Sequence, residues 1–207
     1  MVISPQTPLV LGSRSPRRRE LLGSLGIPFE SVPGEADETR RSGETAANYL
    51  ERVVRGKLTD VAERVSHRDG VPAILVADTI VVVDDDVLGK PADVAEAEAL
   101  LGRIAGRTHV VHTRYAISVA PALSAPKVER TVESRVTIRR SSATELARYA
   151  ATGEGLDKAG AYAAQGIGAF LVERIEGSFS NVVGLPVCEV VLDFLATGLL
   201  SDFPGAP

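Results

Sequence analysis

The stretch AILVADTIVVV, residues 73–83, decides the fold class. Its first five residues form a continuous apolar run, which is typical of a strand that is buried on both faces of a sheet. Asp78 interrupts the run, and residues 79–83 continue it. The acidic triplet at 84–86 then predicts a turn, after which residues 87–88 begin a returning strand.

Toward the N-terminus, the pattern predicts a strand, a tight loop, a helix, a second strand and a second helix. Residues 8–12 are a short apolar strand. Ser15 and Pro16 then mark a helix start, because serine caps free amides and proline suits the first helical position. Residues 28–32 predict the second strand. The second helix is long, over 45–65, with apolar residues at every third or fourth position.

Toward the C-terminus, alternating apolar and polar residues indicate two half-buried, antiparallel strands among further helices. The expected elements are a helix over 93–104, strands over 110–119 and 132–139, a helix near 143–151, a strand near 170–175 and a helix near 186–196. These elements predict an α/β fold with a mixed, twisted sheet flanked by helices. The 207 residues suit one domain over 1–207, with room for two lobes, better than two independent domains.

The composition narrows the function classes. Aromatic residues make up only 4% of the chain and tryptophan is absent, so the core is expected to be aliphatic. The net charge of −4 is unfavourable for general nucleic-acid binding, because proteins that bind the phosphate backbone are usually basic. Any polyanion must therefore be bound by a local basic cluster.

Cysteine content and hydropathy bear on the compartment. Cys188 is the only cysteine, so no intrachain disulfide is possible, which fits a reducing cytoplasm. We interpret Cys188 as a buried apolar residue. The N-terminal residues do not resemble a signal peptide, and no run approaches the roughly 20 apolar residues that span a bilayer. We therefore expect a cytoplasmic protein without a membrane anchor.

A basic cluster, Ser13-Arg14-Ser15-Pro16-Arg17-Arg18-Arg19, lies at the first predicted helix start. Free amides and the helix dipole favour an anion at this position, and arginine side chains donate paired hydrogen bonds that fit phosphate. Basic residues are unfavourable at a helix start, so a bound anion would explain them. A solvated basic patch is the alternative that this cluster alone leaves open.

Carboxylates form a second feature. Asp78 lies within an apolar strand, where burial is costly unless the charge is paired or bound to a metal. Ligands in α/β proteins often bind at strand ends, although Asp78 could also be the structural partner of a buried arginine. Glu35, Asp37 and Glu38 belong to an acidic loop. With Asp78 they could hold Mg²⁺, or the loop could simply be solvated.

Lysine is rare in this chain. Only four of the 23 basic residues are lysines, namely Lys57, Lys90, Lys127 and Lys158. Lys90 and Lys158 lie in loops beside glycine, which weakly favours a role for a compact charge there. Gly89-Lys90 is not part of a P-loop, because proline follows the lysine and the preceding glycine is missing. His109 and His112 face opposite ways on a predicted strand, so a joint metal site is not expected.

Five segments together carry a family resemblance. They are residues 13–22, residues 77–79 with 88–91, residues 106–109 (Gly-Arg-Thr-His), residues 156–162 (Leu-Asp-Lys-Ala-Gly-Ala-Tyr) and residues 181–186 (Asn-Val-Val-Gly-Leu-Pro). With these blocks in this order, the chain resembles the Maf family of nucleoside triphosphate pyrophosphatases. The resemblance runs from Leu9 to Leu195. It implies a two-lobed Maf/ITPase-like fold around a central cleft, usually in a homodimer.

The resemblance also implies an activity and a set of site residues. Such enzymes hydrolyse a nucleoside triphosphate to the monophosphate and pyrophosphate with a divalent metal cation, Mg²⁺ or Mn²⁺. The key acid falls on Asp78. The other polar positions of the family site fall on Ser13, Arg17, Arg18, Glu38, Lys57, Lys90 and Gln165. Arg17, Thr79 and Gln165 match the pyrimidine pattern, which is linked to dTTP and UTP.

These residues support a mechanistic hypothesis. Asp78 and Glu38 hold the metal together with phosphate oxygens, and Asp78 orients or deprotonates the attacking water. Cationic side chains bind the triphosphate, namely Arg17, Arg18, Lys57 and Lys90. Thr79 and Gln165 are placed to read the polar edge of a pyrimidine. Asp78, Glu38 and Lys90 are thus the catalytic candidates.

Two other functions use the same basic cluster. The chain could be a non-catalytic nucleotide sensor that inhibits cell division through a protein partner. That role needs no carboxylates, which would only repel a nucleotide in the absence of a metal. Alternatively, residues 14–19 could be an RNA-binding arm, against which the acidic net charge, the few aromatic residues and the helical position all weigh.

Overall fold

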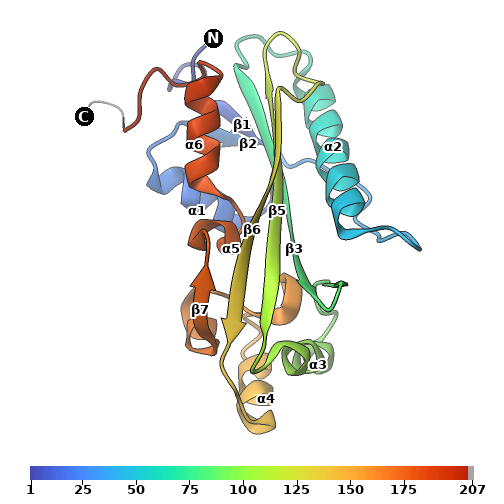
Figure 1. Cartoon of the computed structure of the whole chain (residues 1–207). Coiled ribbons are helices and arrows are strands. Elements are labelled where there is room, and N and C mark those ends of the chain that lie inside the picture. The colour runs from blue at the N-terminus through green and yellow to red at the C-terminus, as the bar shows by residue number, and fades with distance from the viewer. Residues whose placement is uncertain (205–207) are drawn as a thin grey trace. The chain divides into compact units, whose positions relative to one another are not determined.

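The computed structural model describes residues 1–204 and has the predicted α/β class, with a mixed seven-stranded sheet flanked by helices (Figure 1). The strands are β1 (Leu9–Leu11), β2 (Phe29–Ser31), β3 (Ala73–Val83), β4 (Asp86–Leu88), β5 (Thr108–Val119), β6 (Val128–Ile138) and β7 (Val172–Glu176). Their order in the sheet is β2-β1-β3-β5-β6-β7, with β4 paired to β3.

The sheet contains both parallel and antiparallel strand pairs. β1 lies between β2 and β3 and is parallel to both, and its three residues are fully buried. β4 returns antiparallel to β3 after the turn at residues 84–85. β7 pairs antiparallel with β6. The buried strand that the sequence predicted at residues 73–83 is therefore confirmed, at the same bounds.

The helices are α1 (Pro16–Ser24), α2 (Ala46–Val65), α3 (Val94–Ile104), α4 (Ala143–Ala151), α5 (Phe179–Val183) and α6 (Val187–Ala196), with 3-10 turns η1 (Ala159–Ala161) and η2 (Gly166–Leu171). Ser15 caps α1 as predicted, and Thr45 caps α2. The sequence pattern did not predict α5, η1 or η2. Each is too short to show an apolar period, and the residues assigned to a strand at 170–175 divide between η2 and β7.

The residues divide into two compact units. Unit 1 comprises residues 1–78, 114–131 and those from Gly184 onward, and unit 2 comprises residues 79–113 and 132–183. In unit 1, α2 packs its apolar face on β1 and β3 through residues such as Val54, Leu58 and Val61 (Figure 1). In unit 2, the core joins α3, α4 and the sheet through residues that include Leu101, Ile104, Leu146, Tyr149 and Val136.

Polar contacts fasten the last helix to the sheet of unit 1. The Tyr115 hydroxyl on β5 donates to Asp193 Oδ2 of α6 at 2.5 Å, and Arg130 Nη2 donates to Asp193 Oδ1 at 2.7 Å. Asp193 is only 3% exposed, so these two partners offset the cost of burying its charge. The Ile3 amide also donates to the Leu199 carbonyl at 2.8 Å, which places the two ends of the fold side by side.

Cys188 corrects one expectation. It is exposed on α6, whereas the sequence analysis placed it in the core. Leu192, one turn further along the same helix, is also exposed, while Val190, Val191 and Phe194 are buried. Cysteine is buried often enough to favour the core on average, but its position on this helix places it on the outer face.

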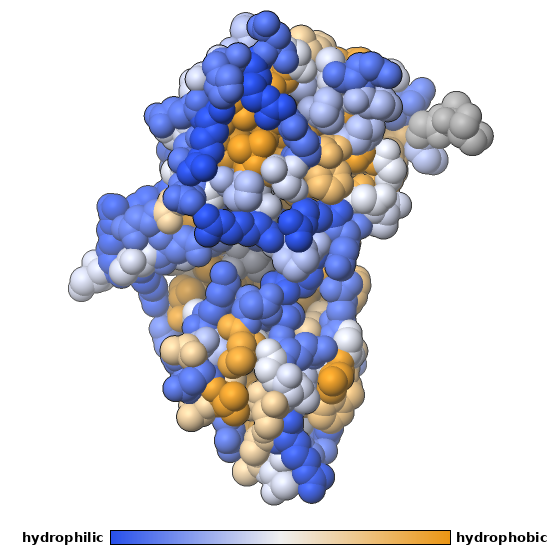
Figure 2. Space-filling model, turned by 180° about the vertical axis from the view of Figure 1, so that it is seen from behind, coloured by the Kyte–Doolittle hydropathy of each residue, from blue (hydrophilic) through white to orange (hydrophobic). Residues whose placement is uncertain are grey.

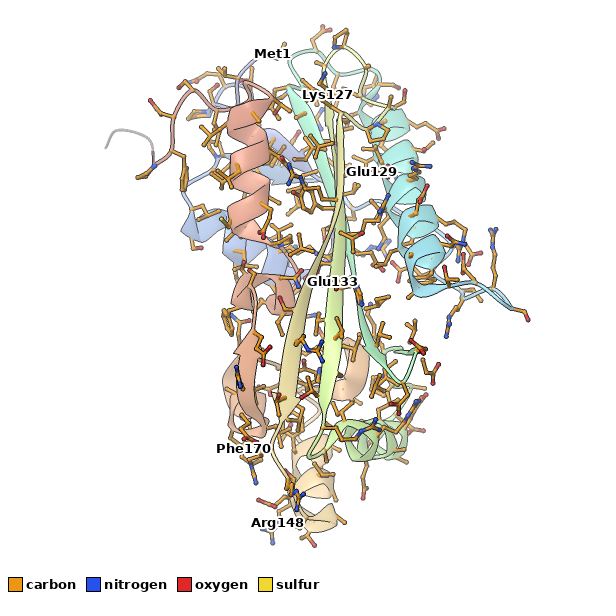
Figure 3. All side chains as sticks on the ribbon, in the orientation of Figure 1. Met1, Lys127, Glu129, Glu133, Arg148 and Phe170 are labelled. Carbon is orange, nitrogen blue, oxygen red and sulfur yellow. The ribbon has the colours of Figure 1, made fainter. Side chains whose placement is uncertain are left out.

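One face of the molecule presents both polar and apolar side chains. Figure 2 shows that hydrophilic and hydrophobic residues are interspersed on this face. Charged side chains also link elements within unit 1. Glu129 of β6, labelled in Figure 3, accepts from Arg55 Nη2 of α2 at 2.8 Å. None of the helices within residues 1–204 combines the length and apolar character that a bilayer crossing requires.

Candidate active site

The basic loop of unit 1 follows β1 and is shaped by close packing. A Cβ at Gly12 would lie 2.6 Å from a Val76 methyl group and 2.8 Å from a Val61 methyl group, so only glycine fits there. Ser13, the next residue, is buried, and its Oγ accepts from the Ser15 amide at 3.2 Å. The loop then enters α1, whose first turn contains no acidic side chain. A helix start without carboxylates is suited to an anion.

Arg18 is held rigidly inside unit 1. It is 8% exposed, its Nε donates to the Gly184 carbonyl at 2.7 Å and its Nη1 donates to Ser13 Oγ at 3.2 Å. Burial lowers the pKa of the Arg18 guanidinium, and the charge of Asp78 counteracts that shift. Arg14, in contrast, is exposed and pairs with Glu35 at 2.6 Å. The basic cluster is therefore divided, and the solvated-patch interpretation fits Arg14 but not Arg18.

Asp78 shares one ammonium group with Glu38. Lys57 Nζ of α2 lies 2.8 Å from Asp78 Oδ1 and 2.6 Å from Glu38 Oε1. Lys57 and Asp78 are 7% and 9% exposed, whereas the Glu38 side chain is about half exposed. The partner that makes the carboxylate in β3 tolerable is thus a lysine on the facing helix. Three elements meet at this charge centre: β3, α2 and the acidic loop.

The acidic loop is tied to α2 by two residues that the sequence analysis did not single out for a polar role. The Tyr49 hydroxyl donates to the Glu38 carbonyl at 3.2 Å, and Arg52 donates to the carbonyls of Asp37 and Thr39 at 2.6 and 3.0 Å. Burial, with the nearby charges of Asp78 and Glu38, raises the pKa of Tyr49, so it remains a donor. Their spacing of three residues on one helix face is the signal that could have revealed this role.

Glu35 and Asp37 do not join the charge centre. Glu35 contacts Arg14, and Asp37 Oδ1 accepts from the Thr39 amide at 2.9 Å. Within residues 1–204, no three His, Cys, Asp or Glu side chains gather closely enough to hold a metal by themselves. The carboxylates that converge on one cationic position are therefore the pair Asp78 and Glu38.

Thr79, the first residue of unit 2, begins a hydrogen-bonded chain. Its Oγ1 lies 2.9 Å from Thr113 Oγ1, and Thr113 in turn donates to the Asn181 carbonyl at 3.1 Å. The Asn181 amide group donates to the Val111 carbonyl at 3.2 Å and to Ser134 Oγ at 3.0 Å. The chain fixes the Thr79 hydroxyl and shows that buried Asn181 has a structural role.

The remaining candidates of unit 2 lie on loops. Lys90 is exposed after β4, and the carbonyl of its neighbour Gly89 accepts from the Gly160 amide at 3.1 Å. This bond joins two of the sequence blocks. Lys158 donates to the Glu154 carbonyl and to Asp157 Oδ1. Gln165 is exposed at the residue that precedes η2.

The candidates are thus distributed over both units. Unit 1 contains Ser13, Arg17, Arg18, Glu38, Lys57 and Asp78, and unit 2 contains Thr79, Lys90 and Gln165. In unit 1 the side chains of Arg18, Lys57, Glu38 and Asp78 interact electrostatically or through ion pairs. Comparison with known proteins gives this arrangement a family context, because a family model described as "Maf-like protein" matches residues 8–196.

The chain belongs to the Maf family. A Myxococcus xanthus relative named "dTTP/UTP pyrophosphatase" is 48% identical over 196 residues, or 94% of each chain. Relatives with the same name from Hahella chejuensis and Geotalea uraniireducens are each 45% identical, over 89% and 88% of this chain and 89% and 91% of their own lengths. The Maf match includes all nine candidate residues.

Two Maf blocks of the sequence meet in the core of unit 2. His109 Nε2 lies 2.8 Å from the Tyr162 hydroxyl, with the two rings edge to face. His109 Nδ1 is buried and has no hydrogen-bond partner among the described residues. Burial lowers the pKa of His109 to about 4. The imidazole is therefore neutral at physiological pH and supports the fold instead of binding phosphate.

His109 is expected to make the protein acid-sensitive. In the unfolded chain the imidazole binds a proton near pH 6.5, whereas in the fold it does so only near pH 4. The free energy of unfolding should therefore fall by up to about 3 kcal/mol as the pH drops through this window. Urea unfolding at pH 7 and pH 4.5 measures the loss. His109→Gln, which stays neutral, should lose less, and an equal loss in both proteins would exclude this histidine as the cause.

Proposed function

We propose that this Maf family chain hydrolyses dTTP and UTP to the nucleoside monophosphate and pyrophosphate. The observation that carries the proposal is the buried charge centre of unit 1, in which Asp78 and Glu38 flank Lys57 and act on the charge of Arg18. The names of the relatives agree with this chemistry, since proteins 41–48% identical to this chain are called dTTP/UTP pyrophosphatases.

Asp78 is proposed to accept a proton from the attacking water. Lys57 Nζ donates to Asp78 Oδ1 at 2.8 Å, and a carboxylate has a second oxygen that can accept a proton. As the water oxygen bonds to the α-phosphorus, its proton passes to Asp78 and the bond from the α-phosphorus to the bridging oxygen breaks. Pyrophosphate leaves with the electrons of that bond. Arg17, Arg18, Lys57 and Lys90 stabilise the charge that develops on the phosphates.

A divalent cation fits the carboxylate pair. Asp78 and Glu38 both contact the Lys57 ammonium group, so the two carboxylates are neighbours and can bind one cation beside Lys57. Mg²⁺ binds hard oxygen donors and often takes only one or two carboxylates together with substrate phosphates. We propose Mg²⁺ or Mn²⁺ as the cofactor, held by Asp78 and Glu38. When bound, the ion would neutralise part of the negative charge of the triphosphate.

Base recognition is assigned to unit 2. Thr79 presents a hydroxyl that Thr113 holds in place, and Gln165 presents an amide, which both donates and accepts hydrogen bonds. Uracil and thymine offer a donor between two acceptors, so an amide and a hydroxyl suit their polar edge. We further propose that the two units act as one domain over residues 1–207, in a cytoplasmic homodimer. Light scattering of the purified chain tests the dimer.

Product analysis tests the reaction. Purified protein with dTTP or UTP and Mg²⁺ or Mn²⁺ should release equal amounts of monophosphate and pyrophosphate, and GTP should react more slowly. Release of orthophosphate and diphosphate instead would place bond cleavage at the γ-phosphorus and contradict the proposal. Nucleotide binding without turnover would support the non-catalytic sensor, which no feature of the charge centre favours.

A further inference from the structure

The segment from Ala163 to Gly168 carries Gln165 at its exposed tip, while both of its ends are buried. Side chains outside the segment hold these ends. The Ala163 amide donates to the Tyr149 hydroxyl oxygen at 3.0 Å. The amides of Ile167 and Gly168 donate to Glu154 Oε1 and Oε2 at 2.9 and 2.7 Å. Backbone amides on both sides of Gln165 are therefore fixed by only two side chains.

Tyr149 and Glu154 also bind each other, and we call this pair the loop clamp. Their side chains meet at 2.9 Å, between the Tyr149 hydroxyl and Glu154 Oε2. The Ala163 amide can only donate, so the Tyr149 oxygen accepts from it and directs its own hydrogen toward Glu154. The clamp thus forms a continuous hydrogen-bonded path from one end of the segment to the other.

The clamp keeps one protonation state near neutral pH. Burial alone would raise the pKa of Glu154, but the amides of Ile167 and Gly168 and the Tyr149 hydroxyl outweigh it, so the pKa is lowered. Burial, together with Glu154, raises the pKa of Tyr149, which is 2% exposed. Glu154 is therefore a carboxylate that only accepts, and Tyr149 is a phenol that donates to it.

Close packing at two glycines restricts the segment further. Gly166 has a φ of 66°, and a Cβ there would lie 2.2 Å from Glu154 Oε1. A Cβ at Gly168 would lie 2.5 Å from the Tyr149 hydroxyl oxygen and 2.4 Å from the Ala163 carbonyl oxygen. Both glycines allow the backbone to approach the clamp closely. The backbone is therefore held in place on both sides of the tip that carries Gln165.

We propose that Glu154 and Tyr149 are positioning residues that set the base selectivity of this enzyme by fixing the backbone around Gln165. The inference rests on the proposed function, in which Gln165 reads the pyrimidine edge. An amide discriminates between a donor and an acceptor on a base only when its own orientation is fixed. Uracil has a donor at N3 and an acceptor at the neighbouring exocyclic oxygen, whereas cytosine has an acceptor at N3 and a donor at the neighbouring exocyclic amine. The clamp should therefore matter most for the choice between UTP and CTP.

The test compares Glu154→Gln and Tyr149→Phe with the wild-type protein. Glu154→Gln places an NH₂ donor against a backbone amide, and Tyr149→Phe leaves the Ala163 amide without its acceptor. For both variants, the ratio of kcat/KM for UTP to that for CTP should fall about tenfold, because KM for UTP rises. The kcat for UTP should change less than about threefold, since neither side chain takes part in the chemistry.

The matched control is Glu145→Gln. Glu145 lies on α4, as Tyr149 does, and its carboxylate accepts from the Ser142 amide at 2.8 Å and from Arg139 Nη2 at 2.8 Å. Like Glu154→Gln, this substitution removes one negative charge from unit 2 and should lower the stability of the protein. The partners that it loses, Arg139 and Ser142, lie outside the segment from Ala163 to Gly168. The UTP to CTP ratio should stay at the wild-type value. An equal fall of the ratio in the control would reduce the clamp to a purely structural role and overturn the proposal.

A double variant shows whether the clamp acts through Gln165. Gln165→Ala alone should lower the ratio, and adding Glu154→Gln should lower it little further. Additive effects, or a ratio that Glu154→Gln leaves unchanged, would overturn the clamp. Dissociation constants for α,β-methylene UTP and CTP provide the same comparison without turnover. These constants test the clamp even if the protein does not hydrolyse UTP, so the two proposals can fail independently.

Discussion

Asp78→Asn should lower kcat for dTTP and UTP about 10³-fold while the protein remains folded. Asparagine has nearly the same shape, and its carbonyl oxygen can still accept from Lys57, which lies 2.8 Å from Asp78 Oδ1 in the native protein. The substitution removes the proton acceptor and one of the two carboxylates beside Lys57. Pyrophosphate release measures turnover, and circular dichroism with thermal unfolding measures the fold.

Asp193→Asn is the control for the loss of a buried carboxylate. Asp193 is also buried in unit 1, where it accepts from Tyr115 and Arg130. Its substitution should lower the melting temperature and leave kcat within about threefold of the wild type, because it lies outside the charge centre. An Asp78→Asn protein that keeps more than a tenth of wild-type kcat would remove Asp78 from the proposed mechanism.

Lys57→Met should lower both activity and stability. Methionine keeps most of the side-chain volume, but Asp78 and Glu38 would lose the ammonium group that lies 2.8 and 2.6 Å from them. Removing one partner of a buried ion pair costs about 3 kcal/mol, so the free energy of unfolding should drop by that order. The kcat/KM for UTP should fall about 10²-fold through the loss of a phosphate-binding charge.

Lys127→Met provides the comparison for this loss of charge. Lys127, labelled in Figure 3, is an exposed lysine of unit 1 outside the charge centre. Its substitution should change the free energy of unfolding by less than about 0.5 kcal/mol. If Lys57→Met unfolds at the same urea concentration as Lys127→Met, the ion pair with Asp78 does not stabilise the fold.

Local chemistry explains why much of the fold was predictable. The apolar run of β3 and the cap at Ser15 are properties of neighbouring residues, and the structure places both as expected. Asp78 also stands out locally, because a carboxylate within an apolar strand requires a partner. The partner itself was not predicted, because the Maf resemblance gave Lys57 only as a phosphate-binding residue. Its signal was nonetheless present, since Lys57 lies midway between Val53 and Val61 on the buried stripe of α2.

Long-range contacts explain what the sequence analysis did not find. Glu154 follows α4 in a loop, where a glutamate is usually solvated, and its role depends on amides that are 13 and 14 residues away. Asp193 lies on a mostly apolar helix, and its partners are on β5 and β6. Neither spacing matches a helical or strand period, so no local pattern indicates these contacts. The error at Cys188 has the same origin, because average burial does not specify a helix face.

Unit 1 consists of three separated stretches of the chain, and this has a consequence for its synthesis. Residues 79–183 supply all of unit 2 and one stretch of unit 1 before Gly184 is made. Arg18 gains its carbonyl partner, Gly184, only then, and Ile3 must wait for Leu199. On the ribosome, unit 2 can therefore reach its final contacts first. The basic loop at residues 13–19, although it precedes unit 2 in the chain, is therefore among the last parts of the molecule to acquire its working geometry.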